Sequence, residues 1–283
     1  ETELKQLPDK IPSNSINRTF IWSGDASVFP AIIKYIEDRK NAKNDILDKD
    51  IRCILVVEDS PRMYSILLPL LYKEIMHQTK NLINQRLSQS KRLLLLRARP
   101  KVLLTQNYET AKLFFKRYRN NILGIISDVE FLKNSTKTTD AGFEFVKWVR
   151  RVDQSIPILL QSTQKNNRAT AENMNTDFLH KESPTFLKKL REFMHYNFGF
   201  GNFVFRLPDY TKVQEAKNIN EFIEGIVNIP EESIVYHANS HHFSNWLAAR
   251  AEFRLASLIR SISANDFNNG ESIRKYILKH LHN

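Results

Sequence analysis

Cysteine and glycine are scarce in this chain, and each scarcity excludes a class of protein. The single cysteine, Cys53, excludes an internal disulfide framework and fits a reducing, cytoplasmic location. Only 7 glycines among 283 residues argue against a glycine-rich nucleotide loop as the main functional device. No apolar run approaches the roughly 18 residues that span a bilayer, so we expect no membrane partner. The sequence has no signal-peptide pattern and begins at Glu1 without methionine, so we expect a piece of a longer protein.

Acidic residues are outnumbered, with 31 Asp and Glu against 42 Lys and Arg, which gives a formal charge of +11. Such a surplus suits nucleic acid, an anionic surface or an acidic partner, although a solvated basic face is the more common cause. The basic residues between Lys73 and Lys101 alternate with Leu and Ile inside a predicted helix. We therefore favour a solvated or docking face there, and do not expect nucleic acid as a partner.

Short apolar runs alternate with helical patterns from Ile51 onward. The runs predict five strands, at 53–57, 102–104, 122–126, 157–160 and 178–179. Helical spacing predicts the segments between and after them, at 61–97, 107–118, 143–149, 167–174 and 184–196. This alternation predicts an α/β fold, a doubly wound five-stranded parallel sheet with helices on both faces and an extended first helix.

The flanking segments have a different character. Residues 1–48 hold a predicted strand at 19–22, then an amphipathic helix, and a charged linker follows at 40–50. Residues after 198 predict a small hairpin and then a mainly helical region. We therefore divide the chain into three parts, 1–48, 49–197 and 198–283.

The predicted strands end in residues with phosphoryl-transfer chemistry. Glu58 and Asp59 follow the first strand, Asp128 follows the third, Ser162 the fourth and Lys181 the fifth. Ligands of an open parallel sheet bind at the carboxyl ends of its strands, so we expect these side chains to meet. Three close carboxylates repel one another and require a cation, for which Mg²⁺ suits oxygen ligands. The serine and lysine would contact phosphoryl oxygens.

Taken together, these motifs resemble the receiver domain of response regulators in two-component signalling. The matching segments are 56–60, 125–128, 157–162 and 178–181, and the resemblance covers about residues 51–197. It implies the flavodoxin-like strand order 2-1-3-4-5 and transfer of phosphate onto an aspartate from a histidine kinase or phosphotransfer protein.

The resemblance assigns a role to each candidate residue. Asp128 is the implied phosphoacceptor, and Glu58, Asp59, Asp128 and the backbone carbonyl of Glu130 are the implied Mg²⁺ ligands. The other implied roles are the switch hydroxyl, the aromatic switch position and the phosphate-contacting lysine, at Ser162, Phe178 and Lys181. The chain departs from the family in its long first helix, its long loop at 128–142 and the two residues between Lys181 and Pro184.

A narrower resemblance concerns the regulatory region of phosphoenolpyruvate synthase and pyruvate phosphate dikinase-like proteins. It lies in segments 97–101, 197–201, 203–209 and 242–247. It implies a regulatory front that acts on a downstream catalytic domain, in cis or in trans. Residues 19–41 would then be the last strand and helix of a preceding receiver-like unit.

Two other functions stay open at this stage. A DNA-binding response regulator would need a helix-turn-helix after residue 198, but the predicted helix with Arg250, Arg254 and Arg260 has an amphipathic pattern. A receiver-shaped interaction domain that takes no phosphate is the other alternative, and the intact Asp128 and Lys181 argue against it.

Three histidines, at 237, 241 and 242, could suggest a zinc site. No cysteine or acidic partner stands beside them, so we expect capping or packing histidines.

The predicted helix at 61–97 would run about 50 Å, longer than a receiver sheet requires. Its overhanging part carries apolar residues that need a cover, namely Leu82, Ile83, Leu87, Leu93, Leu94 and Leu96. We favour the C-terminal region as that cover, through Trp246, Leu247 and Phe253. The N-terminal helix, or a second chain in a homodimer, is the alternative.

Overall fold

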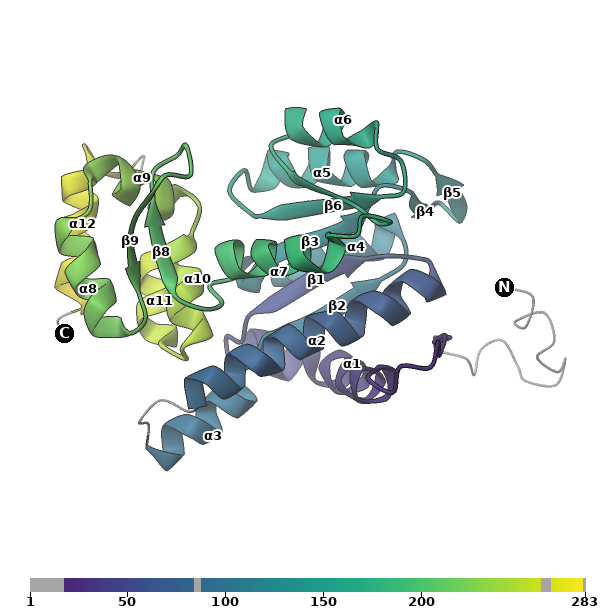
Figure 1. Ribbon diagram of the computed structural model, residues 1–283, viewed down its shortest axis with the longest axis horizontal. Helices are drawn as coiled ribbons and strands as arrows, with labels where there is room; N and C mark the ends of the chain where they lie inside the picture. Colours follow the sequence, from purple (N-terminus) through teal and green to yellow (C-terminus); the bar gives the residue numbers. More distant parts are fainter. Residues whose placement is uncertain (1–17, 84–87, 261–265, 282–283) are drawn as a thin grey trace, which may run out of the picture.

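A parallel sheet forms the centre of the computed structural model, which describes residues 18–83, 88–260 and 266–281 (Figure 1). Its strands are β1 (Cys53–Val57), β2 (Lys101–Thr105), β3 (Ile122–Asp128), β6 (Ile158–Ser162) and β7 (Asp177–His180). All neighbouring pairs are parallel. Every residue of the first four of these strands is buried, as continuous apolar runs predict for strands covered on both faces. The α/β class and the five parallel strands are confirmed.

The order along the sheet is β2-β1-β3-β6-β7. This numbering differs from the predicted 2-1-3-4-5 because a hairpin, β4 (Phe131–Lys133) and β5 (Thr136–Thr138), follows β3 and forms a separate two-stranded sheet. Asn134 and Ser135 close the hairpin with positive φ angles of 49° and 63°, as tight hairpin turns require. The long loop predicted at 128–142 is therefore partly a hairpin.

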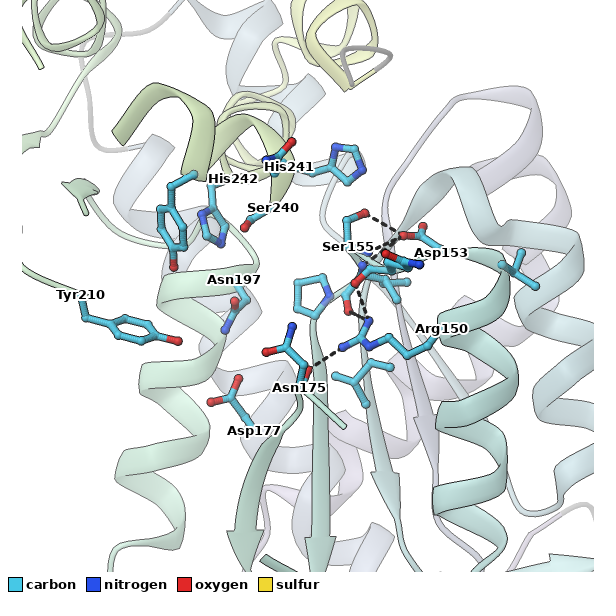
Figure 2. A pocket seen from close by; sticks show the side chains of 17 residues that line it. Arg150, Asp153, Ser155, Asn175, Asp177, Asn197, Tyr210, Ser240, His241 and His242 are labelled. Atoms are coloured by element: carbon cyan, nitrogen blue, oxygen red, sulfur yellow. Dashed lines mark hydrogen bonds between the residues drawn. The ribbon is translucent and has the colours of Figure 1, made fainter. Parts of the chain in front are cut away.

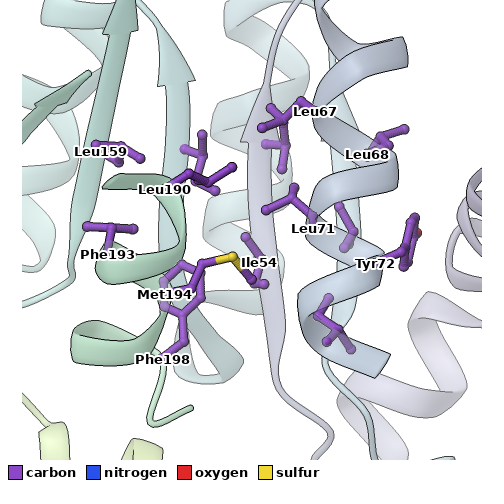
Figure 3. Packing of buried hydrophobic residues seen from close by; sticks show 14 of the residues in the cluster. Ile54, Leu67, Leu68, Leu71, Tyr72, Leu159, Leu190, Phe193, Met194 and Phe198 are labelled. Atoms are coloured by element: carbon purple, nitrogen blue, oxygen red, sulfur yellow. The ribbon is translucent and has the colours of Figure 1, made fainter. Parts of the chain in front are cut away.

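Helices cover both faces of the sheet (Figure 1). One layer consists of α1 (Val28–Ala42), α2 (Pro61–Ile83) and α7 (Phe186–Asn197). The other consists of α4 (Tyr108–Tyr118), the 3-10 turn η4 (Arg119–Asn121), α5 (Ala141–Val152) and α6 (Asn167–Asn173). Figure 3 shows the first layer, where Leu67 and Leu71 of α2 and Met194 of α7 pack over Ile54. Each fully buried side chain of this size contributes roughly 1.5–3 kcal/mol.

The prediction of one helix over 61–97 is wrong. The structure has two helices, because α2 ends at Ile83 and α3 (Gln89–Arg97) begins after Ser88, whose carbonyl accepts from the backbone N–H of Arg92 (3.0 Å). Serine is a favoured residue just before a helix, so Ser88 is a start signal inside an otherwise continuous helical pattern. Figure 1 shows α3 beside the end of α2.

The predictions for residues 19–50 are wrong in two places. Residues 19–22 form no strand; instead the ring of Phe20 packs against Tyr35 and Tyr64, and the backbone N–H of Ile21 donates to Ser65 Oγ (2.9 Å). The expected linker is helical as far as Asp48, because a π-helical segment, η3 (Lys43–Asp48), continues α1. Apolar residues of the segment around Phe20 and of the α1–η3 helix pack into the two hydrophobic clusters on the sheet. This packing holds both segments in place.

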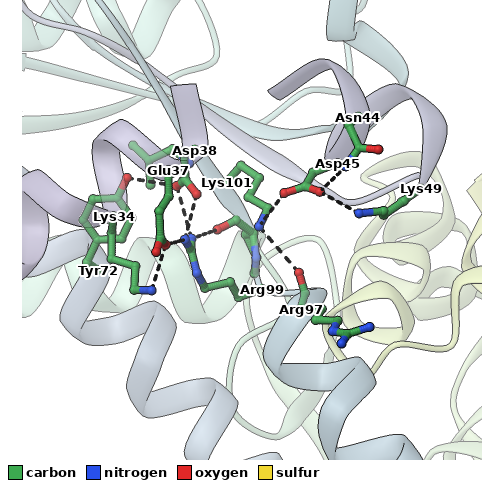
Figure 4. A network of polar contacts seen from close by, with 12 residues as sticks. Lys34, Glu37, Asp38, Asn44, Asp45, Lys49, Tyr72, Arg97, Arg99 and Lys101 are labelled. Carbon is green, nitrogen blue, oxygen red and sulfur yellow. Dashed lines mark hydrogen bonds and ion pairs between the residues drawn. The ribbon is translucent and has the colours of Figure 1, made fainter. Parts of the chain in front are cut away.

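A buried polar network ties α1 to the sheet (Figure 4). Asp38 of α1 is 1% exposed. Its carboxylate accepts from Arg99 Nη1 (3.1 Å) and Nη2 (2.8 Å), from the Tyr72 hydroxyl (2.9 Å) and from the backbone N–H of Val102 (2.9 Å). The network joins α1 and α2 to the start of β2.

The C-terminal unit has its own core. A hairpin, β8 (Phe203–Arg206) and β9 (Lys212–Ala216), packs with five helices, which are α8 (Ile219–Asn228), α9 (Glu231–Asn239), α10 (His242–Ala249), α11 (Phe253–Arg260) and α12 (Gly270–Leu281). Phe203 and Phe222 pack against the buried Trp246, and Phe243 packs against both phenylalanines. The predicted hairpin and helical region are confirmed.

The C-terminal unit docks on the helical overhang only in part as predicted. Leu82 and Leu95 bury themselves with Ala251, and Phe253 packs against this cluster. Trp246 and Leu247 belong instead to the core of the C-terminal unit, and the overhang keeps three exposed leucines, Leu93, Leu94 and Leu96. Leu87 lies outside the described residues. None of the helices in the described ranges has the length and apolar character needed to cross a bilayer.

Candidate functional site

An acidic cluster lies at the carboxyl edge of the sheet. Glu58 and Asp59 directly follow β1, and Asp128 is the last residue of β3, the neighbouring parallel strand. One carboxylate oxygen from each lies within 4.8 Å of the others. The sheet therefore brings together three side chains that are up to 70 positions apart, as the strand-end pattern predicts.

Lys181 closes the cluster from the other side. It follows β7, and its backbone N–H donates to the carbonyl of Ser162 (2.9 Å), which continues the parallel ladder. Its Nζ donates to Glu58 Oε2 (2.8 Å) and to Asp128 Oδ2 (2.6 Å). Burial alone would lower the pKa of Lys181, but its attraction to these two carboxylates outweighs burial and raises that pKa. Lys181 is thus positively charged and held against Glu58 and Asp128.

Glu58 is fully buried, and the pKa of its carboxyl group is strongly raised. Burial, and then repulsion from Asp128, raise the pKa of Glu58 to about 7 despite the ion pair with Lys181. Gln161 Nε2 also donates to Glu58 Oε2 (2.9 Å). Gln161 stands opposite Asp128 in the β3–β6 register, and the sequence argument overlooked it although it precedes Ser162 directly.

Asp59 carries an unsatisfied carboxylate oxygen in the site. Its Oδ1 is buried and, among the described residues, has no hydrogen-bond partner. Burial raises the pKa of Asp59, and the charge of Lys137 on the β4–β5 hairpin lowers it by less. A buried acceptor without a donor is costly, and a cation would satisfy it. Three clustered carboxylates, one with a free oxygen, therefore fit the predicted Mg²⁺ site.

The loop after Asp128 is held tightly around the Asp128 carboxylate. The backbone N–H of Val129 donates to Asp128 Oδ1 (2.7 Å), with that of Glu130 at 3.4 Å. Gly142, at the start of α5, leaves no room for a side chain, because a Cβ there would lie 2.3 Å from the carbonyl oxygen of Asp128. Metal binding by the carbonyl of Glu130 stays a prediction.

Ser162 and Phe178 lie near the cluster but do not join it. Ser162 ends β6, and its Oγ accepts from the backbone N–H of Gln164 and from Asn167 Nδ2, both at 3.0 Å. Phe178 is 7% exposed on β7, with the Arg168 guanidinium 5.1 Å from its ring centre. Ser162 stands at the end of β6 and Phe178 within β7, as the sequence predicts, and their switch roles stay predictions.

The histidines pack in the C-terminal unit. His237 Nε2 accepts from the backbone N–H of Arg206 (3.0 Å), so its proton is on Nδ1, which donates to Nδ1 of His242 (3.0 Å). Across the described parts of the chain, the three carboxylates are the only candidate metal-binding group of His, Cys, Asp and Glu side chains. The packing role predicted for His237 and His242 is confirmed.

No protein-family model matches the chain, and no curated protein matches it either. The site is therefore interpreted from its own geometry.

Proposed function

We propose that residues 49–197 are a response-regulator receiver that accepts a phosphoryl group on Asp128, with Mg²⁺ bound, and so regulates an attached or partner enzyme. The observation that carries this proposal is the Lys181–Asp128 ion pair, 2.6 Å long, inside a cluster of three carboxylates at the carboxyl edge of the sheet. A histidine kinase or phosphotransfer protein would supply the phosphoryl group. The regulated enzyme would be of the phosphoenolpyruvate synthase type.

The strand order supports this proposal once the inserted hairpin is left out. Counted by their own order along the chain, the five strands of the sheet run second, first, third, fourth and fifth. This is the flavodoxin-like arrangement, in which β1 and β3 are neighbours and the crevice at their carboxyl ends binds the ligand. Asp59 and Asp128 stand at that crevice.

The residues suit transfer from a phosphohistidine. A carboxylate oxygen of Asp128 attacks phosphorus, a P–O bond forms, and the P–N bond breaks with its electron pair left on the imidazole, which takes a proton from water. Lys181 balances the charge that develops on the phosphoryl oxygens. Mg²⁺, held by Glu58, Asp59 and Asp128, would supply further neutralisation of those oxygens.

Phosphorylation would change the electrostatics of the cluster. An acyl phosphate on Asp128 carries more negative charge than the carboxylate it replaces, so it would draw Lys181 away from Glu58. The Ser162 hydroxyl, at the end of β6, is a donor that could follow. These shifts would bias β6 and β7, and β7 includes the buried Phe178.

The DNA-binding alternative is disfavoured by the C-terminal arginines. Arg250 donates to the carbonyls of Gly199 and Gly201, and Arg260 donates to Asn245 and to the carbonyl of Ile122. Both guanidiniums therefore satisfy groups inside the protein. A groove-reading helix would present them to the nucleic acid instead.

The test is phosphorylation by acetyl phosphate with Mg²⁺, followed by intact mass. The wild type is expected to gain one phosphoryl group, and Asp128→Asn is expected to gain none because the nucleophilic oxygen is lost. Asp140→Asn, at an exposed aspartate just before α5, is the matched control and should be labelled like the wild type. The proposal fails if the wild type stays unlabelled or if Asp128→Asn is labelled equally.

A further inference from the structure

Two adjoining cavities lie at the amino-terminal edge of the sheet, opposite the acidic cluster. The smaller has a volume of about 580 Å³ and opens beside the residues that precede β1 and β3. The larger, about 770 Å³, opens where β6 and β7 begin (Figure 2). They share Val152, Asp153 and His241, so they form one continuous cleft between the sheet and the C-terminal unit.

Three arginines line the smaller cavity. Arg52 is 4% exposed; its Nη1 donates to the carbonyl of Asn120 (2.8 Å), while its buried Nε has no partner within the described ranges. Arg260 reaches the cavity from α11; its two terminal nitrogens each donate one hydrogen bond within the protein, to Asn245 Oδ1 (3.0 Å) and to the carbonyl of Ile122 (3.1 Å), and its remaining N–H groups would serve a ligand. Arg119 reaches the cavity from η4 at the surface. Burial, and then the nearby charge of Arg52, lower the pKa of Arg260 to about 10. The guanidiniums of Arg52 and Arg260 therefore repel one another in a partly desolvated space.

The two carboxylates of the smaller cavity offset the charge of the three arginines only in part. Asp153 Oδ1 accepts from the backbone N–H and hydroxyl of Ser155, at 2.9 and 2.7 Å. Asp50 accepts from Asn121 Nδ2 (2.6 Å) and stands 3.7 Å from Arg52. Three cations thus face two carboxylates that are already hydrogen-bonded. An anion with several oxygens, such as a phosphate, would relieve this imbalance by accepting from two or more guanidiniums.

The larger cavity is lined by neutral polar side chains and by the charged Arg150, Asp153 and Asp177. Arg150 donates to the carbonyls of Ile156 (2.7 Å) and Asn175 (2.8 Å). Figure 2 shows the side chains of Asn175, Asn197, Ser240 and Tyr210 around it. At the junction with the smaller cavity, the buried Nδ1 of His241 has no hydrogen-bond partner in the described part of the chain. Amides, hydroxyls and an unused imidazole nitrogen suit the hydroxyl groups of a sugar.

We propose that this cleft binds a small organic phosphate, with the phosphate on Arg52, Arg119 and Arg260 and the hydroxyl-rich part in the larger cavity. Because residues of both units line the cleft, the ligand would strengthen the contact between them. The site uses none of the residues of the acidic cluster, so it is independent of the proposed phosphoacceptor function.

The test is isothermal titration calorimetry of the full chain, in EDTA, with ribose 5-phosphate, AMP and inorganic phosphate as probes. Ribose 5-phosphate or AMP is expected to bind saturably and more tightly than inorganic phosphate, and the stronger of the two identifies a sugar phosphate or a nucleotide as the source. Arg119→Ala is expected to weaken binding roughly tenfold or more, which corresponds to about 1.4 kcal/mol. Arg119 is exposed, so this variant should keep the fold.

Three further variants locate the ligand. Arg151→Ala removes an exposed arginine that lines neither cavity and should bind like the wild type. Asp128→Asn should also bind normally, because it lies at the other edge of the sheet. Asn239→Trp places a bulky side chain in the larger cavity and should weaken the organic phosphates but not inorganic phosphate. The proposal is overturned if no organic phosphate binds better than inorganic phosphate, or if Arg119→Ala and Arg151→Ala lose the same affinity.

Discussion

Two buried acidic sites in the same α/β unit differ in how completely their carboxylate oxygens are hydrogen-bonded and paired with cations. Asp38 accepts hydrogen bonds from Arg99, from Tyr72 and from a backbone N–H, and an arginine neutralises its charge. Glu58 and Asp128 share one lysine, and a buried oxygen of the neighbouring Asp59 receives no hydrogen bond from the described residues.

The difference separates a carboxylate that serves the fold from one that is available to a ligand. Folding selects against buried polar groups without partners, so a saturated site such as Asp38 is explained by stability alone. An undersaturated cluster costs stability and calls for another explanation, which here is a bound cation. Three changes test this distinction, from the largest expected effect to the smallest.

Removal of the partner of Asp38 should have the largest effect. Arg99→Ala leaves a buried charge without its cation, and we expect the free energy of unfolding to fall by about 3–5 kcal/mol. Arg97→Ala, which removes an exposed arginine from the last turn of α3, is the control and should change it by under about 1 kcal/mol. Urea unfolding of both variants measures the difference. Equal effects would mean that the Asp38 network contributes no more than surface charge.

The buried pair His237 and His242 extends the comparison to side chains that would become positively charged on protonation. Burial, followed by the charge of Arg206, lowers the pKa of His242 to about 3. A lowered histidine pKa contributes stability that is complete above the unfolded pKa of about 6.5 and is lost as pH falls below it. Between pH 7 and pH 5, His242 alone should therefore cost about 2 kcal/mol.

The measurement is the difference between wild type and His242→Asn, by urea unfolding at both pH values. Glu58 acts in the opposite direction, because its raised pKa favours the folded state as pH falls, and the subtraction cancels its contribution. His180→Asn, at a surface-accessible histidine, is the control and should keep the wild-type pH dependence. A His242→Asn variant with that same dependence would contradict the assignment.

The smallest effect is expected at the undersaturated site. Asp59→Asn removes a charge whose pKa is raised by burial, so without Mg²⁺ the unfolding free energy should rise slightly, by under about 1 kcal/mol. With Mg²⁺ the order should reverse, because binding to the folded state stabilises the wild type in proportion to ligand concentration and the variant loses a ligand oxygen. Thermal unfolding across a Mg²⁺ titration measures both. Equal stabilisation of the two proteins by Mg²⁺ would remove Asp59 from the site.

Local pattern was sufficient to predict the positions of the candidate site. The apolar runs that end at Val57, Asp128 and Ser162 are strands because they are buried on both faces, and their parallel alternation with helices places all their ends at one edge. Glu58, Asp59, Asp128 and Lys181 follow from that rule without knowledge of any contact.

Tertiary packing decided the features that local pattern could not. The helical periodicity of the sequence extends across Ser88, so it did not predict that a new helix begins there. The apolar segment near Phe20 packs against two aromatic rings instead of pairing with another strand. The Asn134-Ser135 hairpin turn is a weaker signal than a turn with glycine.

The sequence by itself therefore determined the five strands of the parallel sheet, their order in the chain and the acidic edge, because these depend on short-range periodicity. Only the tertiary structure decided that Gln161 would contact Glu58, that Asp38 would be saturated by Arg99, and that Arg52 and Arg260 would share a cavity. Those pairs are separated by 61 or more positions, and their contact is set by how whole helices and units pack rather than by any local signal.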